Sequence, residues 1–236
     1  MDWLSLVSNA SLVMPRFGIK AIMRKSARAY TSELVPADIV QAVVLAASRA
    51  PSSKNTQPWK LVLVQGQALE NLRQDYVAAF GSGKAPSFEY TYSPDPLPEA
   101  YKKRATDLGK AFLTHKGIAR EDKEKRKEHD CENFRFFGAN QVFFLAVNKG
   151  EYGQGTFLDC GLFLQALITE LHNNGLGCCP QYSAMAYPDL LRKHIPNSEN
   201  LLFLLALPFG YPKADNVANT FVTQREPLES FFRVVG

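Results

Sequence analysis

The chain has 236 residues, a formal net charge of +4 and a hydrophobic content of 46%, with 16 phenylalanines. This length suits one large domain or two small ones, and the composition can build a sizeable core and is not that of a disordered chain. The charges concentrate in a mixed run at 120–130 and lack the clustered basic face of a nucleic-acid-binding protein, which argues against that class.

The first 22 residues are predicted to form an amphipathic or loosely ordered lead-in. Asp2 stands where a signal peptide would carry basic residues, and no apolar run approaches membrane-spanning length. We therefore expect a soluble cytoplasmic protein that does not enter a membrane.

The cysteines and histidines do not indicate a disulfide framework or a metal site. The four cysteines are irregularly spaced without a Cys-x-x-Cys pair, and the four histidines form no His-Glu-x-x-His motif. We predict no metal. Cys178 and Cys179 have no sequence-local base or cation that would activate a nucleophile, so we interpret both as buried small hydrophobes.

The first polar motif is the stretch 24–30, which reads Arg-Lys-Ser-Ala-Arg-Ala-Tyr. Its three cations would repel one another if they were simply buried, so they must face solvent or an anion. A phosphate suits them, because guanidinium groups bind it through two hydrogen bonds and a serine adds a donor. The alternative is a solvated basic face.

A helix is predicted over 37–48, because Pro36 interrupts the preceding chain and apolar residues then recur at helical spacing. The loop that follows, 51–59, reads Pro-Ser-Ser-Lys-Asn-Thr-Gln-Pro-Trp. Its two prolines exclude a regular helix, and its hydroxyls and carboxamides both donate and accept hydrogen bonds. Such a loop either holds a planar heteroaromatic ligand or is an ordinary connector. We interpret Trp59 as a packing residue.

The middle of the chain is predicted to contain a buried strand at 61–64, a helix at 67–80 and a second strand at 142–147. Residues 81–137 read as an insertion. Its long loop, 81–98, carries three aromatic residues and is predicted to be a lid or a disordered segment. Two helices are expected between 99 and 137, the second with an alternately charged, solvated face.

A long central helix is predicted from Thr156 to a glycine cap at Gly175. The turn 175–182, Gly-Leu-Gly-Cys-Cys-Pro-Gln-Tyr, follows it. After a further helix from Tyr187, the run 201–207 is predicted as a strand. An apolar arm at 230–235 is interpreted as a segment that embraces a partner subunit.

These motifs together resemble the FMN-dependent nitroreductase family, in the same order along residues 24 to 225. The matches are Arg-x-Ser-x-Arg at 24–28, the loop 51–59, Gly-Leu-Gly-x-Cys-Pro at 175–180, and Gly-Tyr-Pro at 210–212. The resemblance implies a single α+β domain with a nitroreductase-like fold, whose central, mostly antiparallel sheet is flanked by helices. It also implies an intertwined homodimer with the flavin at the subunit interface.

The resemblance assigns cofactor-binding roles to residues of each motif. The basic cluster and Arg225 would hold the flavin phosphate and ribityl chain, although Thr223 stands where the family often has a second cation. The loop would contact the flavin of the partner, mainly through Ser52, Ser53 and Asn55. Backbone N–H groups after Pro180 would face the flavin N5 and O4 atoms. The full set of implied cofactor-binding residues is Arg24, Lys25, Ser26, Arg28, Pro51, Ser52, Ser53, Asn55, Gln57, Pro180, Gln181, Tyr182 and Arg225.

The implied activity is transfer of hydride from NADPH or NADH, through FMN, to a nitroaromatic or quinone acceptor. No catalytic side chain is assigned, because the flavin carries the redox chemistry. The stretches at 179–181 and 187–189 look closest to the branch that reduces nitroaromatic acids such as nitrobenzoate. Two alternatives stay open: a flavin-dependent dehydrogenase or dehalogenase on the same scaffold, and a flavin-binding regulatory or storage protein without turnover.

Overall fold

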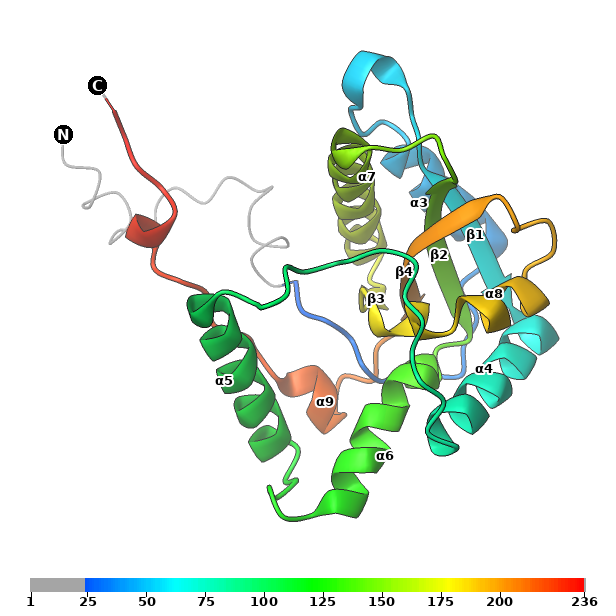
Figure 1. Cartoon of the computed structure of the whole chain (residues 1–236). Coiled ribbons are helices and arrows are strands. Elements are labelled where there is room, and N and C mark those ends of the chain that lie inside the picture. Colours follow the sequence, from blue (N-terminus) through cyan, green and yellow to red (C-terminus); the bar gives the residue numbers. More distant parts are fainter. Residues whose placement is uncertain (1–23, 236) are drawn as a thin grey trace.

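The computed structural model describes residues 24–235, so the predicted lead-in lies outside the described residues. A four-stranded sheet forms the centre, with strand order β1-β2-β4-β3 and every neighbouring pair antiparallel (Figure 1). Its strands are β1 (Lys60–Gln65), β2 (Gln141–Asn148), β3 (Gly177–Cys178) and β4 (Leu201–Gly210). The predicted antiparallel sheet flanked by helices is confirmed.

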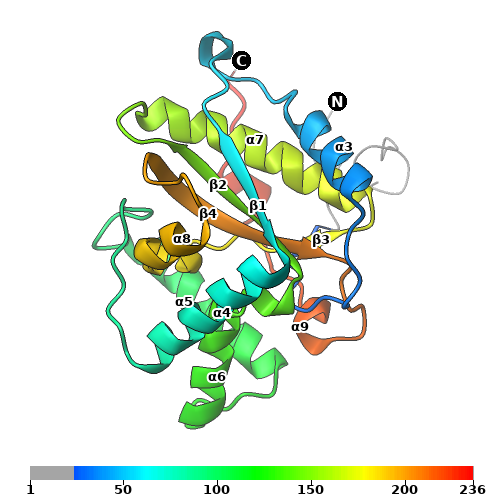
Figure 2. The same ribbon diagram turned by 90° about the vertical axis from the view of Figure 1, so that its right-hand side faces the viewer.

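Continuous apolar sequence in β2 and β4 follows from burial on both faces of the sheet. The first face is covered by α3 (Ala37–Ala47) and α7 (Gln154–Asn173), which also pack against each other (Figure 2). In this layer Phe143 stacks on Phe209 with ring centroids 4.4 Å apart. Trp59 stacks on Phe163 of α7 at 4.8 Å, which confirms that Trp59 is a packing residue.

The opposite face packs against α4 (Gly66–Gly81), the short helix α8 (Pro188–His194) and the end of α6 (Lys123–Phe134). Tyr76 of α4 is fully buried there, and its hydroxyl donates to the carbonyl oxygen of Ala184 at 2.6 Å. Bonding of this phenol removes the cost of burying an unpaired polar group. The two layers therefore have separate apolar cores on either side of the sheet.

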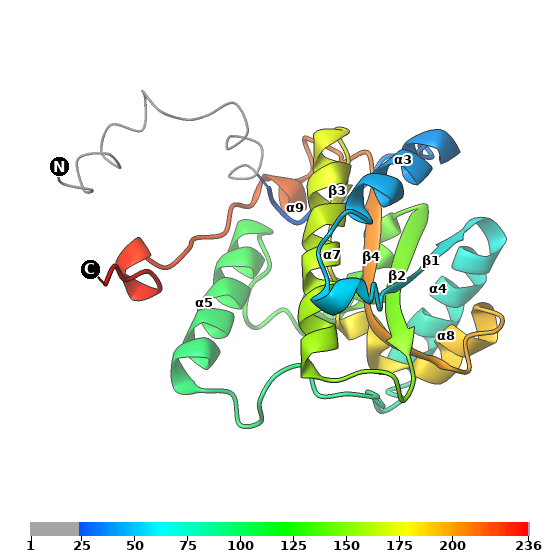
Figure 3. The ribbon, with the colours of Figure 1, turned by 90° about the horizontal axis from the view of Figure 1, so that it is seen from above.

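The predicted insertion contains an irregular loop, then α5 (Glu99–His115) and α6. Figure 3 shows α5 set apart from the sheet and beside the segment that follows the short helix α9 (Val217–Thr220). Phe112 is the one buried residue of α5. Its ring lies 5.0 Å from that of Phe221, just after α9. No helix between residues 24 and 235 is both long and apolar enough to cross a membrane.

Candidate functional site

The basic segment, residues 24–30, lies against β3. Ala27 donates its N–H to the carbonyl oxygen of Cys178 at 3.0 Å, and Ser26 forms a parallel bridge to the same residue. The single O–H donor of the buried Tyr30 is shared between the carbonyl oxygens of Ala27 at 2.7 Å and Pro208 at 3.0 Å. Burial raises the pKa of Tyr30 well above its usual value, so this phenol stays a donor. The segment is thereby fixed at the sheet edge that leads into residues 179–183.

Gly177 makes this close approach possible. A Cβ added there would lie 2.6 Å from the Cβ of Ala27 and 3.1 Å from that of Pro212. Only a residue without a side chain fits at this separation. The glycine that the sequence motif contains is therefore explained by contact with the basic segment.

The cations of the basic segment have no carboxylate partner among residues 24–235. Lys25 is exposed, while Arg24 and Arg28 are half-buried. The guanidinium carbon of Arg28 lies 4.6 Å over the Phe112 ring, and the Arg28 N–H donates to Asn219 Oδ1 at 2.6 Å. Positive charge without a protein counter-ion, next to a serine, is the arrangement expected of an anion site.

The turn 179–183 continues from β3 along β4. Cys179 donates to the carbonyl oxygen of Pro208 at 3.1 Å, and Gln181 donates to that of Ala206 at 2.8 Å. The Gln181 side chain is buried, and its Nε2 donates to the carbonyl oxygen of Asn133 at 3.1 Å. Pro180 is exposed.

The expectation that the Gln181 N–H faces a ligand needs correction, because Ala206 already accepts that hydrogen bond. Among residues 24–235, no backbone carbonyl accepts a hydrogen bond from the N–H groups of Tyr182 and Ser183. The donors that remain for a ligand at this turn are therefore those of Tyr182 and Ser183.

The aromatic residues of the predicted lid surround the Tyr182 side chain. Its ring stacks on Phe88 and on Tyr92, with centroids 4.7 Å apart in both pairs. Its hydroxyl donates to the carbonyl oxygen of Tyr90, and the Tyr90 hydroxyl donates to that of Leu204. Burial raises the pKa of Tyr90, which keeps this phenol protonated. The loop thus lies over the turn 179–183, beside a cavity of about 260 Å³. That cavity is lined by Tyr90, Thr91, Tyr92, Leu145, Phe157, Cys160, Gly161, Leu164, Leu204 and Leu205.

The loop 51–59 has a defined local shape. Lys54, Asn55 and Gln57 all have positive φ angles, between 48° and 57°. Gln57 donates its N–H to Ser52 Oγ at 3.0 Å and its Nε2–H to the carbonyl oxygen of Asn55 at 3.1 Å. These contacts hold the backbone while Pro51, Ser53, Asn55 and Gln57 stay exposed and Ser52 half-buried.

Asp159, which the sequence analysis did not assign to the site, attaches the loop 51–59 to α7. This buried carboxylate accepts from the Ser53 N–H, with oxygens at 3.2 and 3.3 Å. It stands early in α7, whereas the basic segment contacts Cys178, just beyond the end of that helix. The 20 residues of α7 span about 30 Å. The structure therefore places the loop and the basic segment near opposite ends of α7 within one chain (Figure 1).

Arg225 lies in the exposed tail that follows α9. Its guanidinium donates to Thr223 Oγ1 and, at 2.9 Å, to the carbonyl oxygen of Gln224. The next residue, Glu226, pairs with Arg104 of α5 at 3.4 Å. These described contacts keep Arg225 within its own tail and do not bring it to the basic segment. Its role in phosphate binding stays a prediction.

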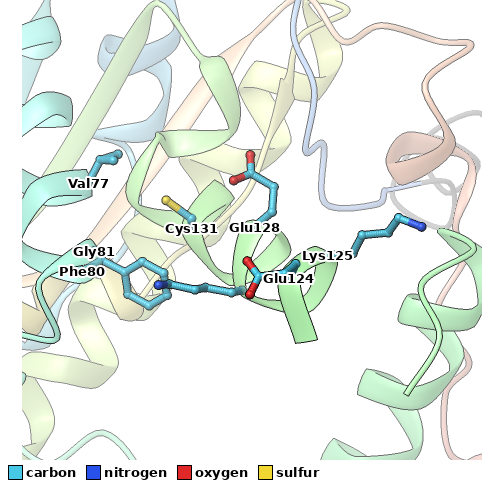
Figure 4. Close-up of a pocket in the computed structure, with 8 residues that line it drawn as sticks. Val77, Phe80, Gly81, Glu124, Lys125, Glu128 and Cys131 are labelled. Carbon is cyan, nitrogen blue, oxygen red and sulfur yellow. The ribbon is translucent and has the colours of Figure 1, made fainter. Parts of the chain in front are cut away.

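A surface hollow of about 480 Å³ between α4 and α6 contains none of the predicted site residues. Figure 4 shows this hollow. It is lined by Val77, Phe80, Gly81, Glu124, Lys125, Lys127, Glu128 and Cys131. All four cysteines are buried free thiols. Burial raises the pKa of Cys178 to about 12 and that of Cys179 above its usual value. The interpretation of this pair as buried small hydrophobes is confirmed.

A family model described as the nitroreductase family matches residues 21–211. The nitroreductase NfnB of Mycolicibacterium smegmatis is 31% identical over 196 residues, which cover 83% of this chain and 81% of that protein. A 4-nitrobenzoate reductase of Pseudomonas putida is 26% identical over 228 residues, which cover 96% of this chain and 98% of that protein.

The crystal structures compared include the FMN-dependent nitroreductase NfnB from Mycobacterium smegmatis in complex with NADPH. It superposes with a TM-score of 0.87 at 26% identity, and the match covers 93% of this chain and 97% of that one.

Proposed function

Because this chain belongs to the nitroreductase family, we propose that it is an FMN-dependent oxidoreductase. Its electron donor is NADPH or NADH, and its acceptors are small nitroaromatic or quinone molecules. The observation that carries the proposal is the set of cations at Arg24, Lys25 and Arg28, which lie beside β3 and have no carboxylate partner among residues 24–235. An anionic cofactor would supply the counter-charge that the described carboxylates do not supply.

The residues at the sheet edge fit an FMN molecule. Arg24, Lys25, Ser26 and Arg28 present charge and a hydroxyl to a phosphate. The N–H groups of Tyr182 and Ser183 lie on the turn that follows and would donate to the edge of the flavin ring. When bound, FMN would supply the redox chemistry, which is hydride transfer between the nicotinamide and the acceptor. The fixed N–H donors stabilise developing negative charge without reorganising.

The aromatic residues of the predicted lid favour a small aromatic molecule as the acceptor. The rings of Phe88 and Tyr92 stack on Tyr182, the Tyr90 ring meets it edge to face, and the adjoining cavity has mainly apolar walls. Offset stacking on such rings suits a flat nitroaromatic or quinone. The relative that reduces 4-nitrobenzoate supports nitroaromatic acids as the first acceptors to try.

A second copy of the chain completes the proposed site. The loop 51–59 lies near the end of α7 opposite the basic segment, so it would reach the flavin of a partner. Exposed apolar residues support this homodimer, namely Leu158, Leu162, Phe231, Phe232, Val234 and Val235. Free thiols fit a reducing, cytoplasmic compartment.

Purified protein tests the proposal directly. We expect a yellow protein that NADPH or NADH bleaches under anaerobic conditions, with the colour restored by 4-nitrobenzoate or a quinone. Colour that neither nicotinamide bleaches would support the non-catalytic alternative. Bleached protein that only a halogenated aromatic reoxidises would support a dehalogenase.

The homodimer is tested by sedimentation of the protein with and without FMN. Removal of flavin should favour dissociation, since each site uses both copies. A monomer that holds FMN tightly would contradict the shared site.

A further inference from the structure

We propose that Phe112, a residue of the insertion, positions Arg28 for the flavin, an inference that rests on the function proposed above. The Phe112 ring lies 4.6 Å beneath the guanidinium carbon of Arg28, and the Phe137 ring lies 6.0 Å from it. Phe112 is buried, with 8% of its surface exposed, and it is the one buried residue of α5. It belongs to none of the motifs that identify the cofactor site.

Stacking on a ring holds an arginine differently from pairing with a carboxylate. The ring contacts the flat face of the guanidinium, while its N–H donors point outward in the guanidinium plane. Among the described residues, the Arg28 side chain donates to no protein acceptor and pairs with no carboxylate. Arg28 is therefore held in place with its charge and its donors available to an anionic ligand.

The surroundings of Phe112 keep its ring in this position. The ring packs 5.0 Å from Phe221, and His129 lies against it at 5.5 Å. Lys116 approaches the same ring at 5.9 Å, but Glu132 binds the ammonium group of Lys116 at 2.7 and 2.9 Å. Glu132 thus neutralises the nearby cation that would otherwise repel Arg28.

The inserted helices and the segment after α9 therefore meet at one ring, which supports one arginine of the basic segment. Backbone contacts fix the other side of Arg28, because its N–H donates to Asn219 Oδ1 at 2.6 Å. Asn219 in turn donates to the carbonyl oxygen of Ala29 at 2.8 Å. The side chain of Arg28 then extends from this fixed backbone and packs on the Phe112 ring.

The test is a double-mutant cycle on full-length protein, with the FMN dissociation constant as the readout. Phe112→Leu removes the ring but keeps an apolar side chain, and Phe112→Tyr keeps the ring. A cation–π contact is worth between about twofold and thirtyfold in affinity, depending on its burial. We expect Phe112→Leu to weaken FMN binding within that range and Phe112→Tyr to bind within about twofold of the original.

The second arm of the cycle separates positioning from general structural damage. In an Arg28→Met background, Phe112→Leu should have little further effect on FMN affinity, because the residue that it positions is gone. Phe80→Leu is the matched control, since Phe80 also stacks on a ring, that of Phe134 at 4.8 Å, but carries no cation in the described structure. It should leave FMN affinity unchanged.

Equal losses from Phe112→Leu with and without Arg28 would overturn the inference, as would unchanged affinity in the single variant. Far-ultraviolet circular dichroism of flavin-free protein checks folding, and Phe112→Met replaces the leucine variant if that one does not fold. Original protein that fails to bind FMN would instead overturn the proposed function and, with it, this inference.

Discussion

Replacement of Gly177 by alanine should separate the basic segment from β3. The new Cβ would lie 2.6 Å from the Cβ of Ala27 and 3.1 and 3.3 Å from two carbons of Pro212. Carbon atoms pack best at about 3.5–4.0 Å, so Ala27 has to withdraw by about 1 Å. Gly177 does not need a positive φ angle, and the penalty is therefore steric.

The withdrawal also affects the hydrogen bond next to the clash. Ala27 donates its N–H to Cys178 at 3.0 Å, and a shift of about 1 Å breaks a bond of that length. Overpacking costs about 1–3 kcal/mol, and the lost bond about 1 kcal/mol. Alanine recovers about 0.5–1 kcal/mol of backbone entropy. We expect the free energy of unfolding to fall by about 2–3 kcal/mol.

Urea denaturation of the flavin-free protein, at one fixed concentration because oligomers unfold in a concentration-dependent way, measures this loss. Gly109→Ala on α5 is the control, because a Cβ there meets nothing within 4 Å, and it should stabilise by about 0.5–1 kcal/mol. Ala27→Gly, added to Gly177→Ala, removes the closest contact and should restore most of the loss. FMN affinity should fall and recover in parallel. A Gly177→Ala protein within about 0.5 kcal/mol of the original, with full FMN affinity, would refute the close approach.

Three further predictions each concern one buried or hydrogen-bonded group of the described structure. Asp159→Ala should cost about 1–3 kcal/mol and increase protease cleavage near Ser53, whereas Asp159→Asn should retain much of the contact; equal cleavage in all three proteins would rule out the anchor. Burial alone would raise the pKa of Glu132, but hydrogen bonds from His129 and Lys116 hold it below its usual range. Glu132→Gln should therefore destabilise by about 1–2 kcal/mol at pH 7. This contribution is complete above the unfolded-state pKa and is lost as the pH falls through the lower folded-state pKa, so the difference should close in acid; a gap that widens in acid would refute it. Burial raises the pKa of all four thiols, so at pH 8 the native protein should react with a thiol reagent at least about a hundredfold more slowly than urea-unfolded protein.

Much of the fold was predictable because burial leaves a clear pattern in the sequence. The strand predicted at 61–64 is part of β1, and those predicted at 142–147 and 201–207 lie inside β2 and β4. The helix predicted over 37–48 is observed as Ala37–Ala47. Strands covered on both faces have continuous apolar sequence, and amphipathic helices have spaced apolar residues. These patterns are local, so they can be detected without knowing the partner elements.

The unpredicted features depend on neighbours that are distant in the sequence. β3 has two residues, too few for a periodic pattern, and it is a strand only because β4 pairs with it. Asp159 is one acid in an apolar helix, and its role depends on the Ser53 N–H. Phe112 sits in a polar helix with one buried position. The Gln181 N–H is bonded to Ala206 because the chain after β3 continues along β4, which local sequence does not indicate.

The position of α7 explains why the motifs of one site are separated within one chain. The loop 51–59 is anchored at Asp159, early in this helix, and the basic segment lies beyond its end. The part of the helix from Asp159 to Asn173 is about 20 Å long. The loop and the basic segment of one chain are therefore not neighbours. A twofold axis that crosses α7 near its middle, where Leu162 and Gln165 are exposed, would place the two helices antiparallel. The early part of one helix then lies beside the end of the other, so both sites are completed by the same contact, and separation of the subunits would disrupt both.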